Sequence, residues 1–185
     1  MNRILPKSFV ALLFLALSQQ TWAETPQHKL ASFLSGTGNQ IFLAAGVLMP
    51  VLTNESDGKV RSLRSADALL TSAALSEGLK LIVRERRPGS GTADSFPSGH
   101  ATAAFAVATM ESVYHPKQAI FWYGGATLIS GSRVALHVHY VHDVIVGTAL
   151  GYATAKLELN SKHGLLLYPV ISSASGNGVG FNFRF

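Results

Sequence analysis

The chain has 185 residues, of which 48% are hydrophobic and 14% are charged, and this composition suits one compact domain with a substantial core. The formal net charge is +5, and no dense run of lysines and arginines is interleaved with aromatic residues, so the sequence does not favour nucleic-acid binding. Cysteine is absent, which excludes disulfides.

Residues 1–23 have the pattern of a secretory signal peptide. The basic residues Arg3 and Lys7 precede an apolar run that ends at Leu17, and a small residue, Ala23, closes the pattern. We therefore expect cleavage after Ala23 and an exported, periplasmic protein. An uncleaved N-terminal anchor that associates the protein with the membrane is the alternative.

The next part of the chain is predicted to contain two helices. A polar, glycine-containing stretch over 24–39 precedes an apolar segment over 41–52, which we expect to be buried or to lie on a membrane. Residues 63–83 are predicted as one long helix, because apolar residues recur at near-helical spacing at Leu63, Ala66, Leu69, Leu70, Ala73, Ala74, Leu79 and Ile82. Pro88 ends any continuation past the basic segment 84–87.

Three further apolar segments follow, over 101–114, 118–132 and 143–157. Each is shorter than the ~20 residues that a membrane-spanning helix needs. The sequence therefore favours a water-soluble α-helical bundle within residues 24–160.

The C-terminal extension, residues 161–185, differs from the rest of the chain. Apolar and small or polar residues alternate on both sides of a serine- and glycine-rich stretch, which predicts a short β-hairpin. We expect this hairpin to cover one face of the helical core, and contact with a membrane or a partner is the alternative. The predicted fold class is all-α with a short C-terminal β-hairpin.

The motif Pro97-Ser98-Gly99-His100 opens one of the predicted helices. Unpaired backbone N–H groups and the positive end of the helix dipole make a helix N-terminus suitable for anions. Gly99 would let a phosphate oxygen approach the backbone, Ser98 would add a hydroxyl donor, and His100 can transfer a proton near neutral pH. A capped helix with a surface histidine is the alternative.

Three basic side chains are candidates to complete an anion site. Lys80 and Arg87 are seven residues apart, so both project from one side if the helix continues through them. Arg133 carries a planar fork of donors that suits a phosphate group. A solvated basic helix end is the alternative for the first two.

The segment between Ser132 and Asp143 contains three histidines. If a helix begins near His139, then His139 and Asp143 lie one turn apart, and the carboxylate can hold one imidazole N–H. The other ring nitrogen is then free to act as a nucleophile or base. A metal site formed by His137, His139, His142 and Asp143 is the competing interpretation.

These motifs together resemble the three-part signature of the type 2 phosphatidic acid phosphatase superfamily, which also contains bacterial class A acid phosphatases and vanadium haloperoxidases. The three parts are Lys80 with Arg87-Pro88, then Pro97-Ser98-Gly99-His100, then Ser132-Arg133 with His139 and Asp143. The resemblance covers residues 80–143 and implies the helical bundle of that superfamily.

The resemblance also implies a role for each motif residue. The phosphate-binding residues would be Lys80, Arg87, Ser98, Gly99 and Arg133. His139 would attack phosphorus and form a phosphohistidine, Asp143 would hold and polarise His139, and His100 would protonate the leaving oxygen and then activate water. Hydrolysis would need no metal or other cofactor.

The expected substrate is a phosphomonoester or a pyrophosphate, either a phosphorylated lipid met at a membrane surface or a small soluble ester of the acid-phosphatase type. A vanadate-dependent haloperoxidase, with vanadate bound to His139, is a second hypothesis. A third is an envelope protein that binds anionic lipid headgroups without turnover.

Overall fold

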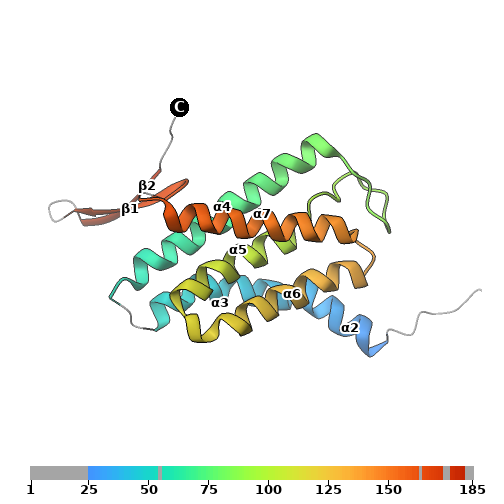
Figure 1. Ribbon diagram of the computed structural model, residues 1–185, viewed down its shortest axis with the longest axis horizontal. Coiled ribbons are helices and arrows are strands. Elements are labelled where there is room, and N and C mark those ends of the chain that lie inside the picture. The colour runs from blue at the N-terminus through green and yellow to red at the C-terminus, as the bar shows by residue number, and fades with distance from the viewer. Residues whose placement is uncertain (1–24, 54–55, 163, 173–175, 182–185) are drawn as a thin grey trace, which may run out of the picture.

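The computed structural model describes residues 25–53, 56–162, 164–172 and 176–181, and the predicted signal peptide over 1–23 lies outside them. The elements in chain order are α2 (Pro26–Phe33), the π-helical segment η1 (Leu34–Gly38), α3 (Asn39–Leu52), α4 (Gly58–Val83), α5 (Gly99–Tyr114), the 3-10 turn η2 (Pro116–Gln118), α6 (Ala119–Ala135), α7 (Val141–Asn160), β1 (Leu167–Ser172) and β2 (Gly176–Phe181). The prediction of an α-helical bundle is confirmed (Figure 1).

Helix α5 is the centre of the bundle, and α3, α4, α6 and α7 all pack against it (Figure 1). Between Ala101 and Glu111 every residue except Phe105 is buried. Most of these residues are alanine or threonine, whose short side chains let neighbouring helices approach on every side. The bulkier part of the core lies between α5 and α6, where Trp122 packs edge to face on Phe42 of α3 with ring centroids 5.2 Å apart.

Two glycines on α7 bring that helix into backbone contact with α5. A Cβ atom on Gly151 would lie 2.1 Å from the carbonyl oxygen of Thr102, and one on Gly147 would lie 2.6 Å from the carbonyl oxygen of Ser98. Any side chain at either position would therefore push the helices apart. The contact is reinforced where both helices begin, because the Ser98 N–H donates to the Asp143 carbonyl at 3.0 Å.

The predicted helix over 63–83 is confirmed as part of α4, but its buried face is polar. The buried residues include Ser62, Ser65, Ala68, Ser72 and Ser76, whereas Leu70, Leu75, Leu81 and Ile82 are exposed. Small side chains are needed where α4 meets α5, and the hydroxyl of Ser72 is satisfied by the carbonyl of Leu69 within the helix. The apolar periodicity thus identifies the helix but not the side that packs.

Large apolar side chains also remain exposed on other outer faces. Leu81 and Ile82 of α4 have exposed fractions of 72% and 79%, and Ile120 and Phe121 of α6 each have 77%. Within the described residues, none of the helices has both the length and the hydropathy needed to cross a bilayer.

The two strands pair antiparallel, with Leu167 opposite Phe181 and Ser172 opposite Gly176. In Figure 1 they project beyond the C-terminal end of α7, at the opposite end of that helix from His139. The residues that lead into β1 are anchored by a buried carboxylate: Asp67 accepts the backbone N–H groups of Leu165 at 2.7 Å and Leu166 at 3.0 Å.

Glu158 of α7 also binds the backbone that leads into β1, beside Asp67. Its carboxylate accepts the Leu165 N–H at 2.9 Å and pairs with Arg64 Nε at 2.9 Å. Burial, together with the neighbouring charge of Asp67, raises the pKa of Glu158 to about 7. The contacts that hold the start of β1 therefore include a carboxyl group, that of Glu158, with a pKa near neutral pH.

We predict that the Gly151→Ala variant loses roughly 1–3 kcal/mol of its free energy of unfolding, because the new methyl group has no space against the Thr102 backbone. The matched control is Gly131→Ala on α6, where nothing lies within 4 Å of the added Cβ, and there the change is neutral or stabilising. Urea denaturation measures both. Equal effects of the two substitutions would contradict the close α5–α7 contact.

A second prediction concerns the pH dependence of stability. Because the folded-state pKa of Glu158 is raised, its contribution is fully present below its unfolded-state pKa and is lost as pH rises through about 7. We expect the free energy of unfolding to fall between about pH 5 and pH 7.5, and this fall to be smaller in Glu158→Gln. Parallel pH profiles in the two proteins would contradict the assignment.

Candidate active site

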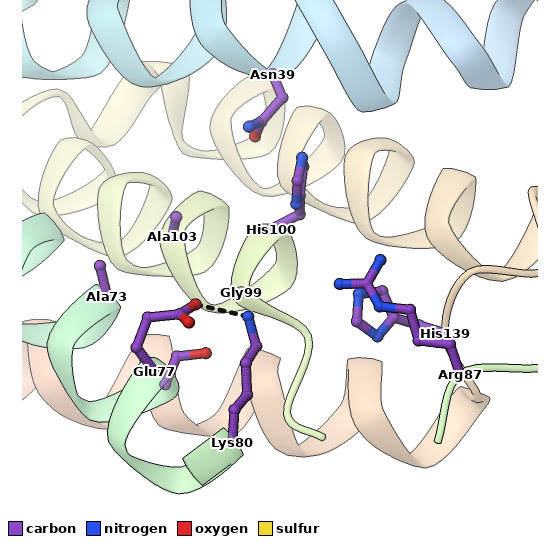
Figure 2. Close-up of a pocket in the computed structure, with 10 residues that line it drawn as sticks. Asn39, Ala73, Glu77, Lys80, Arg87, Gly99, His100, Ala103 and His139 are labelled. Atoms are coloured by element: carbon purple, nitrogen blue, oxygen red, sulfur yellow. Dashed lines mark hydrogen bonds and ion pairs between the residues drawn. The ribbon is translucent and has the colours of Figure 1, made fainter. Parts of the chain in front are cut away.

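A cavity of about 290 Å³ opens where α4 ends and α5 begins. Five of the residues predicted as site residues line it: Lys80, Arg87, Gly99, His100 and His139 (Figure 2). The other three lie next to these residues without lining the cavity. Asp143 contacts His139, Ser98 precedes Gly99, and the charge of Arg133 acts on both histidines. Residues from α4, α5 and the turn before α7 therefore meet at one place.

Lys80 and Arg87 reach the cavity from different elements, a helix and the loop that follows it. Helix α4 ends at Val83, where the predicted helix over 63–83 also ends, and Arg84 takes a left-handed conformation with φ of 51°, so the helix does not continue to Arg87. Lys80 extends from the last turn of α4, whereas Arg87 extends from the loop that follows. The turn at Arg84 redirects the chain, and this change of direction places the second cation beside the first.

Both cations have carboxylate partners at the rim. Lys80 Nζ lies 2.6 Å from Glu77 Oε1, and the guanidinium of Arg87 donates two hydrogen bonds of 2.9 Å to Asp94. A hydrogen bond from Thr92, and then pairing with Arg87, hold the pKa of Asp94 below its usual range. Both carboxylates are more exposed than the cations with which they pair.

Arg133 is the most buried of the three cations, with an exposed fraction of 9%. It donates to the Ser35 hydroxyl, while its Nε has no hydrogen-bond partner within the described part of the chain. Burial, and then the nearby charge of Arg87, lower the pKa of Arg133. A buried cation with an unused donor is suited to an anionic ligand.

His139 and Asp143 are paired as predicted, although the local structure differs from the expectation. Helix α7 begins at Val141, so His139 precedes the helix rather than occupying its first turn. Asp143 Oδ2 lies 3.3 Å from His139 Nδ1, and it also accepts the Tyr140 N–H at 2.9 Å and the Ser95 hydroxyl at 2.5 Å. Because a carboxylate only accepts, Nδ1 carries the proton and Nε2 keeps its lone pair.

The electrostatic surroundings of His139 favour the neutral imidazole. Burial lowers its pKa, and the charges of Arg87 and Arg133 lower it further, against the opposing effect of Asp143. A neutral, oriented imidazole beside fixed cations has the properties of a nucleophile toward an anionic substrate.

His100, on the first turn of α5, is also held in place. Its Nε2 lies 3.0 Å from the carbonyl oxygen of Ser35, so Nε2–H is the donor. Burial, followed by the charge of Arg133, lowers the pKa of His100 to about 4. Both histidines that contact this cavity are thus neutral near pH 7 in the free protein.

Ser98 and Gly99 form the N-terminus of α5. The Ser98 hydroxyl is buried and caps α5 by accepting the Ala101 N–H at 3.5 Å. A Cβ on Gly99 would lie 3.3 Å from Lys80 Nζ, closer than almost all real Cβ contacts. Glycine therefore allows the ammonium group and the helix N-terminus to face the same point in the cavity.

Several residues at the site have no counterpart in the predictions: Ser35, Asn39, Ser76, Glu77, Asp94 and Ser95. Only Glu77 carries a recognisable signal, since it lies three residues before Lys80 on one helix. Ser35 and Asn39 belong to the stretch described by the sequence only as polar, and their contacts depend on the tertiary fold.

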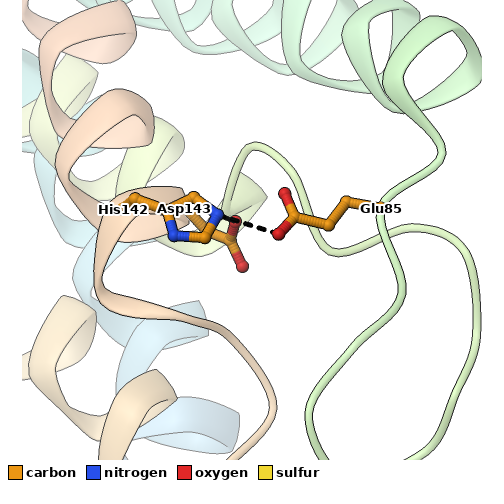
Figure 3. A group of neighbouring side chains, drawn as sticks. All are labelled: Glu85, His142 and Asp143. Carbon is orange, nitrogen blue, oxygen red and sulfur yellow. Dashed lines mark hydrogen bonds and ion pairs between the residues drawn. The ribbon is translucent and has the colours of Figure 1, made fainter.

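The competing metal set is not assembled. His137 has a left-handed φ of 54° in a turn, and within the described residues the single group of three possible ligands consists of Glu85, His142 and Asp143 (Figure 3). His142 Nε2 lies 2.9 Å from Glu85 Oε1 and 3.2 Å from Asp143 Oδ1, so the imidazole bridges two carboxylates. These three side chains are the ones that could hold a cation next to the cavity.

Two solved structures share the fold. LpxE of Aquifex aeolicus has a TM-score of 0.57 and 20% sequence identity, over 83% of this chain and 94% of that chain. The transmembrane PAP2-type phosphatidylglycerolphosphate phosphatase of Bacillus subtilis has a TM-score of 0.55 and 21% identity, over 83% and 86% of the two chains. At these identities the likeness concerns the architecture of the bundle.

Sequence comparison assigns the family. Residues 61–165 match the model of the PAP2 superfamily, and because the match covers more than half of the chain, the protein belongs to that superfamily. Lipid A 1-phosphatase of Porphyromonas gingivalis is 33% identical over 75 residues, which are 38% of this chain. The aligned part spans only 17% of that relative's length.

We predict that binding of inorganic phosphate raises the pKa of His100 above its value of about 4 in the free protein, because the anion offsets the charge of Arg133 and stabilises the imidazolium. NMR titration of the His100 ring in the free and the phosphate-saturated protein measures this, with His100→Asn used to assign the resonance. An unchanged or lower midpoint would show that the anion binds elsewhere.

Proposed function

We propose that the protein is a metal-independent phosphatase that hydrolyses phosphomonoesters or pyrophosphates through a phosphohistidine on His139. The observation that carries this proposal is that two histidines with lowered pKa values and two cations line one small cavity, while the charge of a third cation, Arg133, acts on both histidines. Membership of the PAP2 superfamily supports the same reaction class.

In the first step of the proposed mechanism, Nε2 of His139 forms a bond to phosphorus as the bond from phosphorus to the ester oxygen breaks. Asp143 stabilises the positive charge that develops on the imidazole, since it accepts the Nδ1–H. Lys80, Arg87 and Arg133, with the Gly99 N–H, stabilise the charge on the three equatorial phosphate oxygens. The leaving oxygen takes its proton from His100.

In the second step His100 takes a proton from water, and the resulting hydroxide displaces His139 from phosphorus. His100 therefore acts first as an acid and then as a base. Its low pKa in the free protein suits the second role, and the charge of a bound phosphate dianion favours the protonated form needed for the first.

A phosphorylated lipid is the substrate class that we favour. Leu81 and Ile82 are highly exposed and directly follow Lys80, so apolar surface adjoins the phosphate-binding end of α4. The signal-peptide pattern of residues 1–23 supports export and action at the outer surface of a membrane. The relatives named as lipid A 1-phosphatase and phosphatidylglycerolphosphate phosphatase support the same class.

We predict that His139→Ala lowers phosphate release at least about a thousand-fold, because the nucleophile is lost while the cation site remains. The assay uses purified protein in a chelator, with detergent-dispersed lipid phosphates and an aryl phosphate as parallel substrates. His28→Ala is the matched control, since His28 is exposed on α2 and does not line the cavity.

Three other outcomes would overturn parts of the proposal. Activity of His139→Ala equal to that of the unaltered protein would exclude the phosphohistidine route. Loss of activity in a chelator that is restored by a divalent cation would exclude a metal-independent reaction. Faster turnover of the aryl phosphate than of every lipid would favour a soluble ester as substrate.

A further inference from the structure

Asn39, the first residue of α3, forms part of one wall of the cavity, and the segment before it contacts the site, although both lie outside the family match, which begins at residue 61. The π-helical segment η1 bends at Gly36, whose backbone is not helical, with φ of −101° and ψ of −107°. This bend brings Ser35 to the site, where its carbonyl accepts His100 Nε2–H and its hydroxyl accepts an N–H from Arg133. Two long-range hydrogen bonds therefore hold the segment against the catalytic groups.

Asn39, the first residue of α3, faces the same cavity with an unused acceptor. Its exposed fraction is 8%, and its Oδ1 has no hydrogen-bond partner among the described residues. A buried amide oxygen without a partner is unfavourable, so residues of this kind usually meet a donor. Because Asn39 lines the cavity, a bound ligand can supply that donor.

The position of His100 indicates which part of a substrate reaches Asn39. In the proposed mechanism the leaving oxygen takes its proton from His100, whose ring is held against Ser35 by the bond from Nε2–H to the Ser35 carbonyl. We therefore place the leaving group on the His100 side of the cavity, which Asn39 also lines. In the view of Figure 2, His100 lies between Asn39 and His139, which is consistent with nucleophile and leaving group on opposite sides.

The side chains beside Asn39 determine which leaving groups this part of the cavity can bind. Asn39 Oδ1 accepts a hydrogen bond from a hydroxyl or an amide N–H, whereas an alkyl chain offers no donor. Ala73 and Ala103 also line the cavity, and each contributes only a methyl group, which leaves room beside the amide.

We propose that Asn39, positioned by the bend at Gly36, forms a leaving-group subsite that selects phosphate esters of alcohols with a hydroxyl or amide N–H near the ester carbon, as in glycerol and sugar phosphates. This inference rests on the proposed function, since it takes His100 as the acid that protonates the leaving oxygen.

The test compares glycerol 3-phosphate with n-propyl phosphate, two three-carbon esters that differ by two hydroxyl groups. We expect the unaltered protein to favour glycerol 3-phosphate about ten-fold in kcat/KM. Asn39→Ala should lower kcat/KM about ten-fold for glycerol 3-phosphate and leave n-propyl phosphate nearly unchanged. Asn39→Leu, which keeps the volume but removes the acceptor, should give the same pattern, and thermal unfolding checks that both variants fold.

The exposed neighbour Gln40 provides the matched control, and Gln40→Ala should retain the preference. Equal kcat/KM values for the two esters in the unaltered protein, or equal losses on both esters in the Asn39 variants, would overturn the subsite while leaving the phosphatase intact. If the unaltered protein hydrolyses detergent-dispersed lipid phosphates but neither of the two small esters, the subsite fails and the phosphatase stands. If it hydrolyses no lipid phosphate, neither small ester and no aryl phosphate, the proposed function itself fails, and the subsite fails with it.

Discussion

The site depends on the backbone contact between α5 and α7. Gly147 and Gly151 leave no Cβ between the two helices, and the Ser98 N–H donates to the Asp143 carbonyl where both helices start. Residues that lie far apart in the sequence, such as Ser98 and Asp143, are thereby fixed side by side. The N-terminus of α5, which favours anions, and the carboxylate that orients His139 share this junction.

The electrostatics of the cavity depend on three cations from other parts of the chain. Lys80 and Arg87 line the cavity, Arg133 lies next to it, and the carboxylates that pair with the first two are more exposed than their partners. The positive charge lowers the pKa of both histidines in addition to the effect of burial. Both imidazoles are therefore neutral in the free protein. A bound phosphate dianion favours protonation of His100, the proposed acid. Substrate binding and proton transfer are coupled in this way.

Helix periodicity and short motifs are local properties, so the sequence predicted most of the helices and selected motif residues that the structure places at or next to one cavity. It did not predict which face of α4 is buried, since the serines that pack on α5 are selected for size rather than hydropathy. The placement of Arg87 depends on a left-handed turn at Arg84, which no local signal indicates. Ser35 and Asn39 reach the site only through tertiary contacts, so no spacing rule could have found them.

The central claim is that His139 and His100 face one oxyanion site bounded by Lys80, Arg87 and Arg133. A crystal structure of the protein with orthovanadate tests it most directly, because vanadate adopts the trigonal geometry of a phosphoryl group during transfer. The account predicts vanadium bonded to His139 Nε2, with its oxygens facing the three cations and the Gly99 N–H. Vanadate bound through His100, or at a place remote from both histidines, would contradict it.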